Sequence, residues 1–294
     1  MSTLFNTFYM KINEISPQDN KYLQIINNIA LMPKKLYYIG TLPAERRPTV
    51  AIVGTRKPTT YGRDVTEHLA YELAKRGVVV VSGLALGVDA IGHRAALKAG
   101  GTTIAVLANG LSQIRPMTNR QLGEDMIANG GAIISEYAPE EPPYLNRFLE
   151  RNRIVSGISD AVLITEASSR SGTLNTAKNA LEQGKDVFVV PGNITSPSSA
   201  GCNALLKQGA IPVTDVDDIL ARIAPVLNTD QTQLPLGANP LQTKIIKLLQ
   251  SGVRDGDQLQ EKLALPIHEL SGELTMMEIE GTVRALGANQ WTLR

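Results

Sequence analysis

Short apolar runs alternate with amphipathic segments along residues 50 to about 222. The runs are continuous rather than alternating in polarity, as expected of parallel strands that are buried on both faces. We predict strands at residues 50–53, 78–81, 103–107, 132–135, 161–167, 186–190 and 210–214. Between the first two, Val65, Leu69 and Leu73 recur at helical spacing. The alternation predicts an α/β fold with a doubly wound, mostly parallel sheet that binds ligands at the carboxyl ends of its strands.

Two segments of different character flank this region. Residues 1–49 predict an irregular or partly helical lead-in, in which 33–40 adds a short strand or packs on the sheet. Residues 225–240 contain three prolines among Asn, Thr, Asp and Gln, a composition typical of a linker. We therefore expect one domain over residues 1–224, a linker over 225–240 and a second domain over 241–294.

The last segment predicts three helices followed by a hairpin. Apolar residues at helical spacing mark helices near 241–249, 257–263 and 267–277, and residues 281–285 and 290–293 read as two strands. This order is typical of a winged helix, a variant of the helix-turn-helix. The third helix is acidic, and winged helices serve protein contacts as well as DNA reading, so both roles stay open.

Composition predicts a globular protein without a global charge signal. With 43% hydrophobic and 19% charged residues, the 294-residue chain has enough apolar surface for a substantial core. The net charge of +1 means that any nucleic-acid binding rests on a local cluster. We expect a cytoplasmic protein without a membrane segment. Cys202 is the single cysteine, no apolar run reaches about 18 residues, and the N-terminus is too polar and acidic for a signal peptide.

Three strand ends run into turns rich in Gly, Ser and Thr, and each turn precedes a helix. The predicted ligand-binding residues in these turns are Gly54, Thr55, Arg56, Ser82, Gly83, Gly87, Ser171 and Gly172. Backbone N–H groups at a helix start, with the helix dipole behind them, suit an anion such as phosphate. We predict a phosphate-bearing ligand, clamped by the Arg56 guanidinium beside the turn amides. The alternative is a surface arginine that caps the next segment.

An aromatic and basic cluster precedes the strand at 161–167, with its arginines on a helix predicted at 151–159. It contains Phe148, Arg151, Asn152 and Arg153. In a chain with only 4% aromatic residues, a ring beside two arginines suits single-stranded nucleic acid. A base stacks on the ring, worth roughly 1–3 kcal/mol, while the guanidinium groups follow the backbone. Alternatively, Phe148 packs in the core and the arginines pair with Glu150 or Glu166. At least one of the two arginines is expected to be structural.

The sequence predicts no catalytic residue, metal site or cofactor. Asp89 lies in the first turn of a helix, where it is expected to cap amides. His93 follows on the same face, but no third partner completes an acid–base set. The three histidines are far apart, and Cys202 is expected to be a packing residue.

Together these motifs resemble the DprA/Smf family, the DNA-processing proteins of bacterial natural transformation. The resemblance covers the chain from about Tyr37 to its end. Further matching motifs are Tyr61-Gly62, Val88-Asp89, His93, Ser135-Glu136, Thr173, Pro191-Gly192, Gly201-x-Asn203 and Gly209-Ala210. The resemblance implies an extended Rossmann-like fold, a homodimer, binding of single-stranded DNA and transfer of that DNA to the RecA recombinase.

The chain departs from the family pattern at two places. Many members read Tyr-Pro after the third strand, where this chain reads Arg115-Pro116. We include Arg115 among the predicted DNA contacts, since a basic residue is compatible with that role. Members often carry a small helical N-terminal domain, for which we expect no room ahead of the lead-in.

Three other functions were weighed. A Rossmann dehydrogenase needs G-x-G-x-x-G after its first strand, where this chain reads Gly-Thr-Arg-Lys-Pro-Thr. Phosphoribohydrolases need a glutamate where this chain has Asn175 and Thr176. A nucleotide or small-ligand sensor stays open as the alternative. We predict a non-enzymatic protein that binds and protects incoming single-stranded DNA and loads RecA onto it during natural transformation.

Overall fold

The computed structural model describes residues 11–224, 239–287 and 289–293. The chain divides into two compact units, Met1–Leu227 and Asn228–Arg294. The predicted linker, residues 225–240, lies almost wholly outside the described residues, and its boundaries stay a prediction. Among the described residues, no helix is both long and apolar enough to span a bilayer.

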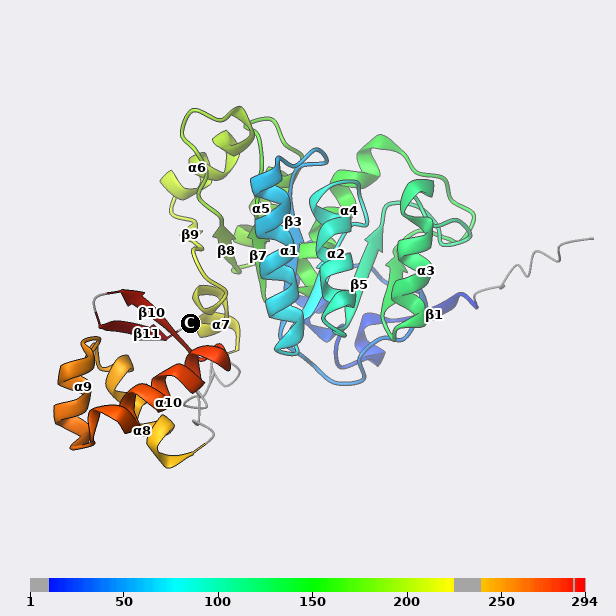
Figure 1. Ribbon diagram of the computed structural model, residues 1–294. Helices are drawn as coiled ribbons and strands as arrows, with labels where there is room; N and C mark the ends of the chain where they lie inside the picture. Colours follow the sequence, from blue (N-terminus) through cyan, green and yellow to red (C-terminus); the bar gives the residue numbers. More distant parts are fainter. Residues whose placement is uncertain (1–10, 225–238, 288, 294) are drawn as a thin grey trace, which may run out of the picture. The chain divides into compact units, whose positions relative to one another are not determined.

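The first unit is built on a nine-stranded sheet with the order β1-β2-β6-β5-β4-β3-β7-β8-β9 (Figure 1). Neighbours from β6 to β9 along this order run parallel, whereas β2 pairs antiparallel with both β1 and β6. The strands are β1 (Asn13–Ile15), β2 (Leu36–Gly40), β3 (Thr49–Val53), β4 (Val79–Ser82), β5 (Thr103–Leu107), β6 (Ala132–Ser135), β7 (Ala161–Ile164), β8 (Asp186–Val189) and β9 (Ile211–Pro212). The predicted mostly parallel α/β sheet is confirmed, extended by two antiparallel strands from the lead-in.

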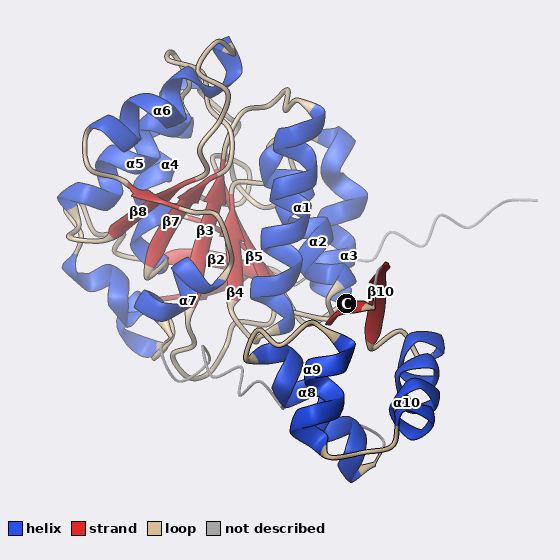
Figure 2. Cartoon of the chain, turned by 60° about the vertical axis from the view of Figure 1, so that its left-hand side comes forward, coloured by secondary structure: helices blue, strands red, loops and turns tan. Residues whose placement is uncertain are grey.

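Helices cover both faces of this sheet (Figure 2). One face carries α1 (Thr60–Lys75), α2 (Val88–Lys98), α3 (Arg120–Ala128) and α7 (Asp217–Ile223), and the other carries α4 (Leu145–Ile158), α5 (Thr173–Glu182) and α6 (Ala200–Lys207). Val50 and Ile52 of β3 pack in the layer of α1, whereas Ala51 and Val53 pack in the layer of α4 and α5. A strand buried on both faces needs apolar side chains at every position, which explains the continuous apolar runs.

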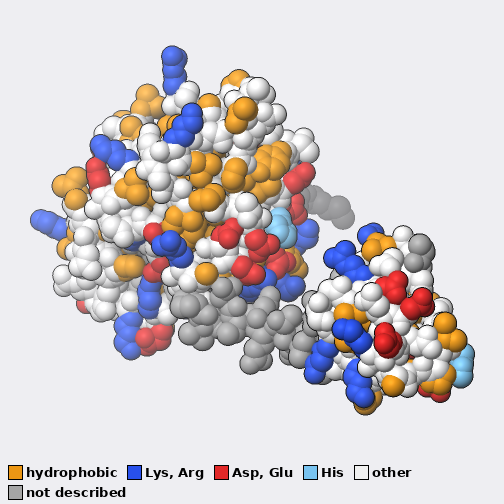
Figure 3. All heavy atoms as spheres, turned by 90° about the vertical axis from the view of Figure 1, so that its left-hand side faces the viewer, with side chains coloured by type: hydrophobic (Ala, Val, Ile, Leu, Met, Phe, Trp, Pro, Cys, Tyr) orange, Lys and Arg blue, Asp and Glu red, His pale blue; other side chains and the backbone are white. Residues whose placement is uncertain are grey.

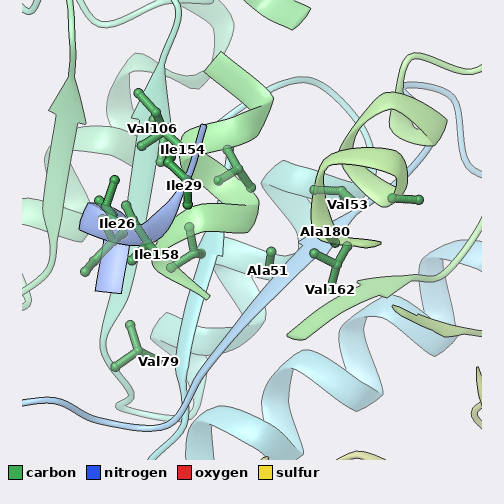
Figure 4. Close-up of a cluster of buried hydrophobic side chains, with 14 of the residues drawn as sticks. Ile26, Ile29, Ala51, Val53, Val79, Val106, Ile154, Ile158, Val162 and Ala180 are labelled. Atoms are coloured by element: carbon green, nitrogen blue, oxygen red, sulfur yellow. The ribbon is translucent and has the colours of Figure 1, made fainter. Parts of the chain in front are cut away.

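The C-terminal half of α4 anchors this helix to the sheet. Ile154 and Ile158 pack in one cluster with Val79 and Val106 of the sheet (Figure 4). Toward its N-terminus the helix is more open, and Leu149 is 50% exposed. The first turns of α4 are therefore free to line a surface at the carboxyl ends of the strands.

The structure moves several predicted boundaries. Helix α4 begins at Leu145 rather than at Arg151, which places Phe148 on the helix. Strand β7 ends at Ile164, three residues before its predicted end, although the Glu166 carbonyl oxygen still accepts a hydrogen bond from the Thr55 N–H at 2.8 Å. The 33–40 segment forms β2, as one of its two predicted alternatives. Strand β1 had no prediction, whereas helix α3 lies in one of the helical segments expected between the strands.

The second unit has three helices and a two-stranded sheet. These are α8 (Pro240–Gln250), α9 (Gly256–Leu263), α10 (Ile267–Ile279), β10 (Val283–Gly287) and β11 (Gln290–Leu293). Side chains of Asn239 and Asp255 cap the first two helices, and Leu259, Leu274 and Met277 lie in the shared core. The winged-helix prediction is confirmed by this order of elements and by the family match reported below. Figure 3 shows basic and acidic side chains together on one face of this unit.

Candidate functional site

The loop between β3 and α1 is held in place by a buried glutamate from the neighbouring strand end. Glu166 is 2% exposed, and its carboxylate accepts hydrogen bonds from the Thr59 backbone N–H (2.8 Å) and hydroxyl (2.7 Å). The Thr59 hydroxyl in turn accepts from the Gly62 N–H at 3.1 Å, which caps α1. A Cβ on Gly62 would collide with the Glu166 carboxylate, so glycine is required there. This clamp fixes the loop that presents Arg56.

The first pocket lies between this loop, α4 and the turn before α5, and has a volume of about 320 Å³. It opens at the carboxyl ends of β3 and β7, where the predicted fold places a ligand. Of the predicted site residues, it brings together Gly54, Thr55, Arg56, Phe148, Arg151, Asn152, Ser171 and Gly172. Segments that are more than 110 positions apart in the sequence thus converge on one cavity.

The second pocket adjoins the first and has a volume of about 350 Å³. Its walls are mainly apolar, and Arg115 lies at it. The lining residues are Arg56, Gly83, Ala85, Leu86, Leu107, Ala108, Asn109, Arg115, Pro116, Met117, Thr118, Pro143, Phe148 and Arg151. Arg56, Phe148, Arg151 and Ala85 line both pockets, so these residues form the partition between them.

Arg56 and Phe148 are in contact at this partition. The guanidinium carbon lies 5.7 Å from the centroid of the ring, within the range of a cation–π interaction. Arg56 is exposed, and Phe148 is only partly buried. The alternative in which Phe148 packs in the hydrophobic core is therefore wrong. A partly exposed aromatic ring and an exposed cation stand side by side at the walls of both pockets.

Arg151 has a structural role beneath the partition. It is 6% exposed, and its guanidinium donates to the carbonyl oxygens of Gly83 (2.9 Å) and Val106. Burial lowers the pKa of Arg151, and the nearby Asp89 carboxylate partly offsets this effect. The alternative in which Arg151 pairs with Glu150 or Glu166 is therefore wrong for this arginine, whose partners are carbonyl oxygens.

The Asp89 carboxylate binds backbone amides in the turn that was predicted to bind phosphate. One of its carboxylate oxygens accepts from the N–H groups of Gly83 (3.0 Å) and Ala85 (3.3 Å). Burial raises the pKa of Asp89, and Arg151 opposes the rise. The predicted capping role of Asp89 holds, but the amides it caps belong to the turn before α2. The predicted anion cradle at Ser82 and Gly83 is wrong, since a carboxylate already fills it.

The other members of that turn also serve the fold. Ser82 is fully buried and donates its hydroxyl to the Ile52 carbonyl oxygen at 2.6 Å. Gly83 has no space for a Cβ, because the Arg151 guanidinium packs there. Gly87 has a φ of +81°, and a Cβ on it would meet the Thr55 carbonyl oxygen. These residues bring two strand-end turns into close approach without lining a free anion site.

Some amides of the other two turns are also engaged within the protein. The Thr55 N–H donates to Glu166, and the Ser171 N–H donates to the Ser168 carbonyl oxygen at 3.1 Å. The Ser171 hydroxyl accepts from the Thr173 N–H at 3.2 Å, so it caps α5. Among the residues that line the first pocket, Arg56 is an exposed cation that can meet a phosphate.

Arg153 and Asn152 take different positions on α4. Arg153 makes a two-pronged ion pair with Glu136 at 2.6 and 2.8 Å, and it does not line either pocket. Asn152 lines the first pocket and lies 3.4 Å from the Asn175 side-chain oxygen. Both arginines of this cluster therefore have internal partners, and the prediction that Arg153 contacts DNA stays a prediction.

His93 is a buried histidine of the α2 core. Its Nδ1 lies 2.7 Å from the Thr103 hydroxyl, and burial, with help from Arg151 and Arg94, lowers its pKa to about 3. Cys202 is also buried, and burial raises the pKa of its thiol to about 11. Within the described residues, no group of three metal-ligating side chains comes together.

Comparison with known proteins identifies the fold and its relatives. Residues 13–224 match the family of DNA recombination-mediator protein A. This chain belongs to that family. Residues 229–289 match the DprA winged helix domain. The recognition made from the sequence motifs is confirmed.

Curated relatives and solved structures agree with the family match. Protein Smf of Escherichia coli (strain K12) is 37% identical over 274 residues, covering 89% of this chain and 72% of that protein. DNA processing protein DprA of Bacillus subtilis (strain 168) is 40% identical over 224 residues, covering 76% of this chain and 74% of that protein. The X-ray structure of DNA processing protein A from Streptococcus pneumoniae matches with a TM-score of 0.67 and 39% identity, over 72% of this chain and 75% of that one.

A second solved structure bears on the ligand. DNA processing protein A from Helicobacter pylori, whose structure is described in terms of a unique single-stranded DNA binding mode, matches with a TM-score of 0.64 and 35% identity. The match covers 72% of this chain and 95% of that one.

Some pocket residues were not predicted to bind ligand. Leu86 and Met117 of the second pocket are 47% and 51% exposed, and Thr176 lines the first pocket beside Thr173 of the predicted turn. Leu86 and Met117 lie on the segments that follow β4 and β5, so their position at the carboxyl ends of strands was the available signal. An apolar side chain in a turn of the sequence does not by itself reveal that it stays exposed.

Proposed function

We propose that this protein binds single-stranded DNA at the two adjoining pockets, as a non-enzymatic recombination mediator. The contact between Arg56 and Phe148 carries this proposal, because it puts an exposed cation and a partly exposed aromatic ring together on the walls of both pockets. Single-stranded DNA offers the matching pair of groups, a phosphate and an unstacked base. The Helicobacter pylori relative, described by its single-stranded DNA binding mode, supports the same ligand.

In this proposal the phosphate and the base are held by different groups. Arg56 takes a phosphate through its guanidinium, since the amides of Thr55 and Gly83 donate within the protein. A base stacks on Phe148 and enters the apolar second pocket, where Leu86 and Met117 exclude water. Arg115, exposed at the second pocket, meets the next phosphate. Because every base can stack on an aromatic ring, binding of this kind depends little on the DNA sequence.

The proposed cellular role follows from the family. The protein protects incoming single-stranded DNA in the cytoplasm and loads the RecA recombinase onto it during natural transformation. It acts as a homodimer, which aligns two binding surfaces along one strand. The family description as a recombination mediator supports this role.

The proposal places DNA binding on the first unit rather than on the winged helix. Helix α10 carries no lysine or arginine, and Glu269, Glu273 and Glu278 lie along it. A helix that enters the major groove needs cations for the phosphates beside it. Its acidic surface and the exposed side chains of Met276 and Ile279 fit a protein contact better.

The test is fluorescence anisotropy with a labelled oligo-dT of about 30 nucleotides, at several salt concentrations. We expect salt-sensitive binding that is displaced poorly by duplex DNA and not by mononucleotides. Arg56→Ala should weaken binding, whereas Arg222→Ala should not. Arg222 is an exposed arginine on α7 that pairs with Asp186, the first residue of β8, and so lies at the opposite end of the strands. Absence of binding, or displacement by a mononucleotide, would favour the alternative of a nucleotide sensor.

A further inference from the structure

A second group of cations lies in a groove between α1 and α2, outside both pockets. The groove has a volume of about 210 Å³ and is lined by Arg63, Glu67, Ile91, Arg94, Ala95 and Lys98. Ile91 and Ala95 are buried and form its floor, and the charged side chains stand exposed at its walls. Helices α1 and α2 lie side by side in Figures 1 and 2, so the groove follows the line between them.

The charges in this groove are not balanced internally. Lys98 pairs with Glu67 at 3.0 Å, which neutralises the one carboxylate of the lining. Within the part of the chain that the structure describes, Arg63 and Arg94 have neither an ion pair nor a side-chain hydrogen bond. Two free guanidinium groups thus face the same hollow. Such a pair suits phosphate groups, because guanidinium binds phosphate oxygens in a forked geometry.

The groove and the first pocket share no lining residue, but both involve elements that start at the carboxyl edge of the sheet. Both helices follow parallel strands and start at the carboxyl edge of the sheet, beside the loops that line the pockets. Arg63 lies in the first turn of α1, four residues after Thr59, which Glu166 clamps. At 1.5 Å per residue, Arg94 lies about 9 Å along α2 from Val88. Along the two helices, Arg63 therefore lies nearer the carboxyl edge of the sheet, where Arg56 is, and Arg94 lies farther from it.

We propose that the groove between α1 and α2 is an additional binding surface for the phosphate backbone of single-stranded DNA as it leaves the pockets. This inference rests on the proposed function. It adds contacts that a strand occupying only the pockets does not reach. The groove serves long strands, and a short oligonucleotide binds without it.

The test compares two oligonucleotide lengths on the full chain. Affinities for oligo-dT of about 8 and about 30 nucleotides are measured at several salt concentrations for Arg63→Gln/Arg94→Gln. The matched control is Lys75→Gln/Arg222→Gln, which removes two exposed cations elsewhere, at the C-terminal end of α1 and on α7. We expect the groove variant to bind the long strand roughly tenfold more weakly, and its salt slope to fall by about 1.4, or about 0.7 for each phosphate contact. The short strand should bind as it does to the control.

The remaining outcomes separate the inference from the proposed function. Equal affinities of groove variant and control for the long strand would overturn the inference and leave the pocket function standing. Equal losses for both lengths would also overturn it, since the arginines would then act through the pockets. If the unmodified protein binds neither strand, the proposed function itself fails. Arg63→Lys/Arg94→Lys, which keeps both charges, should restore most of the salt slope, and single Arg94→Gln serves if the double variant unfolds.

Discussion

The Arg56 guanidinium lies 5.7 Å from the centre of the Phe148 ring, on the partition between the two pockets. One residue comes from the loop after β3 and the other from the first turns of α4. In the proposed complex, Arg56 contacts the ligand through its guanidinium and Phe148 through its ring, so neither contact uses a backbone amide. The cation and the ring should therefore contribute separately to binding, one through phosphate and one through a base.

Phe148→Leu should weaken the binding of oligo-dT without changing its salt dependence. Leucine keeps apolar volume but loses the π-face, and base stacking on such a ring is worth about 1–3 kcal/mol. Arg56→Ala should instead reduce the salt slope by about 0.7, as one phosphate contact is lost. Anisotropy titrations across a salt series measure both. Tyr71→Leu is the control, because Tyr71 also carries a cation above its ring, Lys75 at 6.0 Å, yet lines neither pocket. A changed salt slope in Phe148→Leu would contradict the division of roles.

Gly62→Ala should destabilise the first unit by about 1–3 kcal/mol, the usual range for overpacking. The added methyl group collides with the Glu166 carboxylate, and the clamp on Thr59 must open. Urea unfolding measures the loss, and DNA binding should fall with it as the Arg56 loop is released. Gly272→Ala in α10 is the control, since a Cβ there meets open space and the residue lines neither pocket. An unchanged urea midpoint for Gly62→Ala would show that the carboxylate can move aside.

Arg151→Met should lower the free energy of unfolding by about 1–3 kcal/mol, because it leaves the buried Gly83 and Val106 carbonyl oxygens without this donor and removes the cation that opposes the raised pKa of Asp89. The double variant Asp89→Asn/Arg151→Met should regain part of the loss, since the unpaired charge is removed. Arg94→Met, on an exposed arginine, should change stability little. Denaturant unfolding at neutral pH tests all three. Equal stability of Arg151→Met and Arg94→Met would assign Arg151 to ligand binding alone.

His93 should make the first unit less stable in acid. Burial lowers the pKa of His93 in the folded protein from 6.5 to about 3. Between pH 3 and pH 6.5 the unfolded chain therefore binds one proton more than the folded protein does. The free energy of unfolding is not reduced by His93 above pH 6.5. As the pH falls from 6.5 toward 3, protonation of His93 in the unfolded chain lowers the free energy of unfolding by about 1.4 kcal/mol for each pH unit. His93→Gln should remove this slope. Asp89, whose raised pKa acts in the opposite direction, is unchanged in both proteins. Urea midpoints at neutral and mildly acidic pH measure the difference, and parallel pH profiles would contradict it.

The local pattern was enough to predict the fold. Continuous apolar runs gave the buried parallel strands, and helical spacing gave the winged helix, because both patterns depend on which side of an element faces the core. Strand β1 was missed, since it has only three residues at the sheet edge and its sequence, Asn-Glu-Ile, shows no apolar/polar alternation. The start of α4 was placed late, because Leu145 and Leu149 are exposed and do not mark an apolar face.

By itself, the sequence determined the α/β class, the second unit and the family, because the order and spacing of the motifs can be read without a structure. It also placed Arg56 and Phe148 among the candidates. Only the tertiary structure decided how each candidate is used. Arg151 and Gly83 were predicted as site residues on the same kind of motif as Arg56 and Gly54. In the structure, however, the Arg151 guanidinium is buried against Gly83, and both residues stabilise the fold. Burial and hydrogen-bond partners come from segments distant in the chain, so a local pattern cannot show whether a cation or an amide is free to meet a ligand.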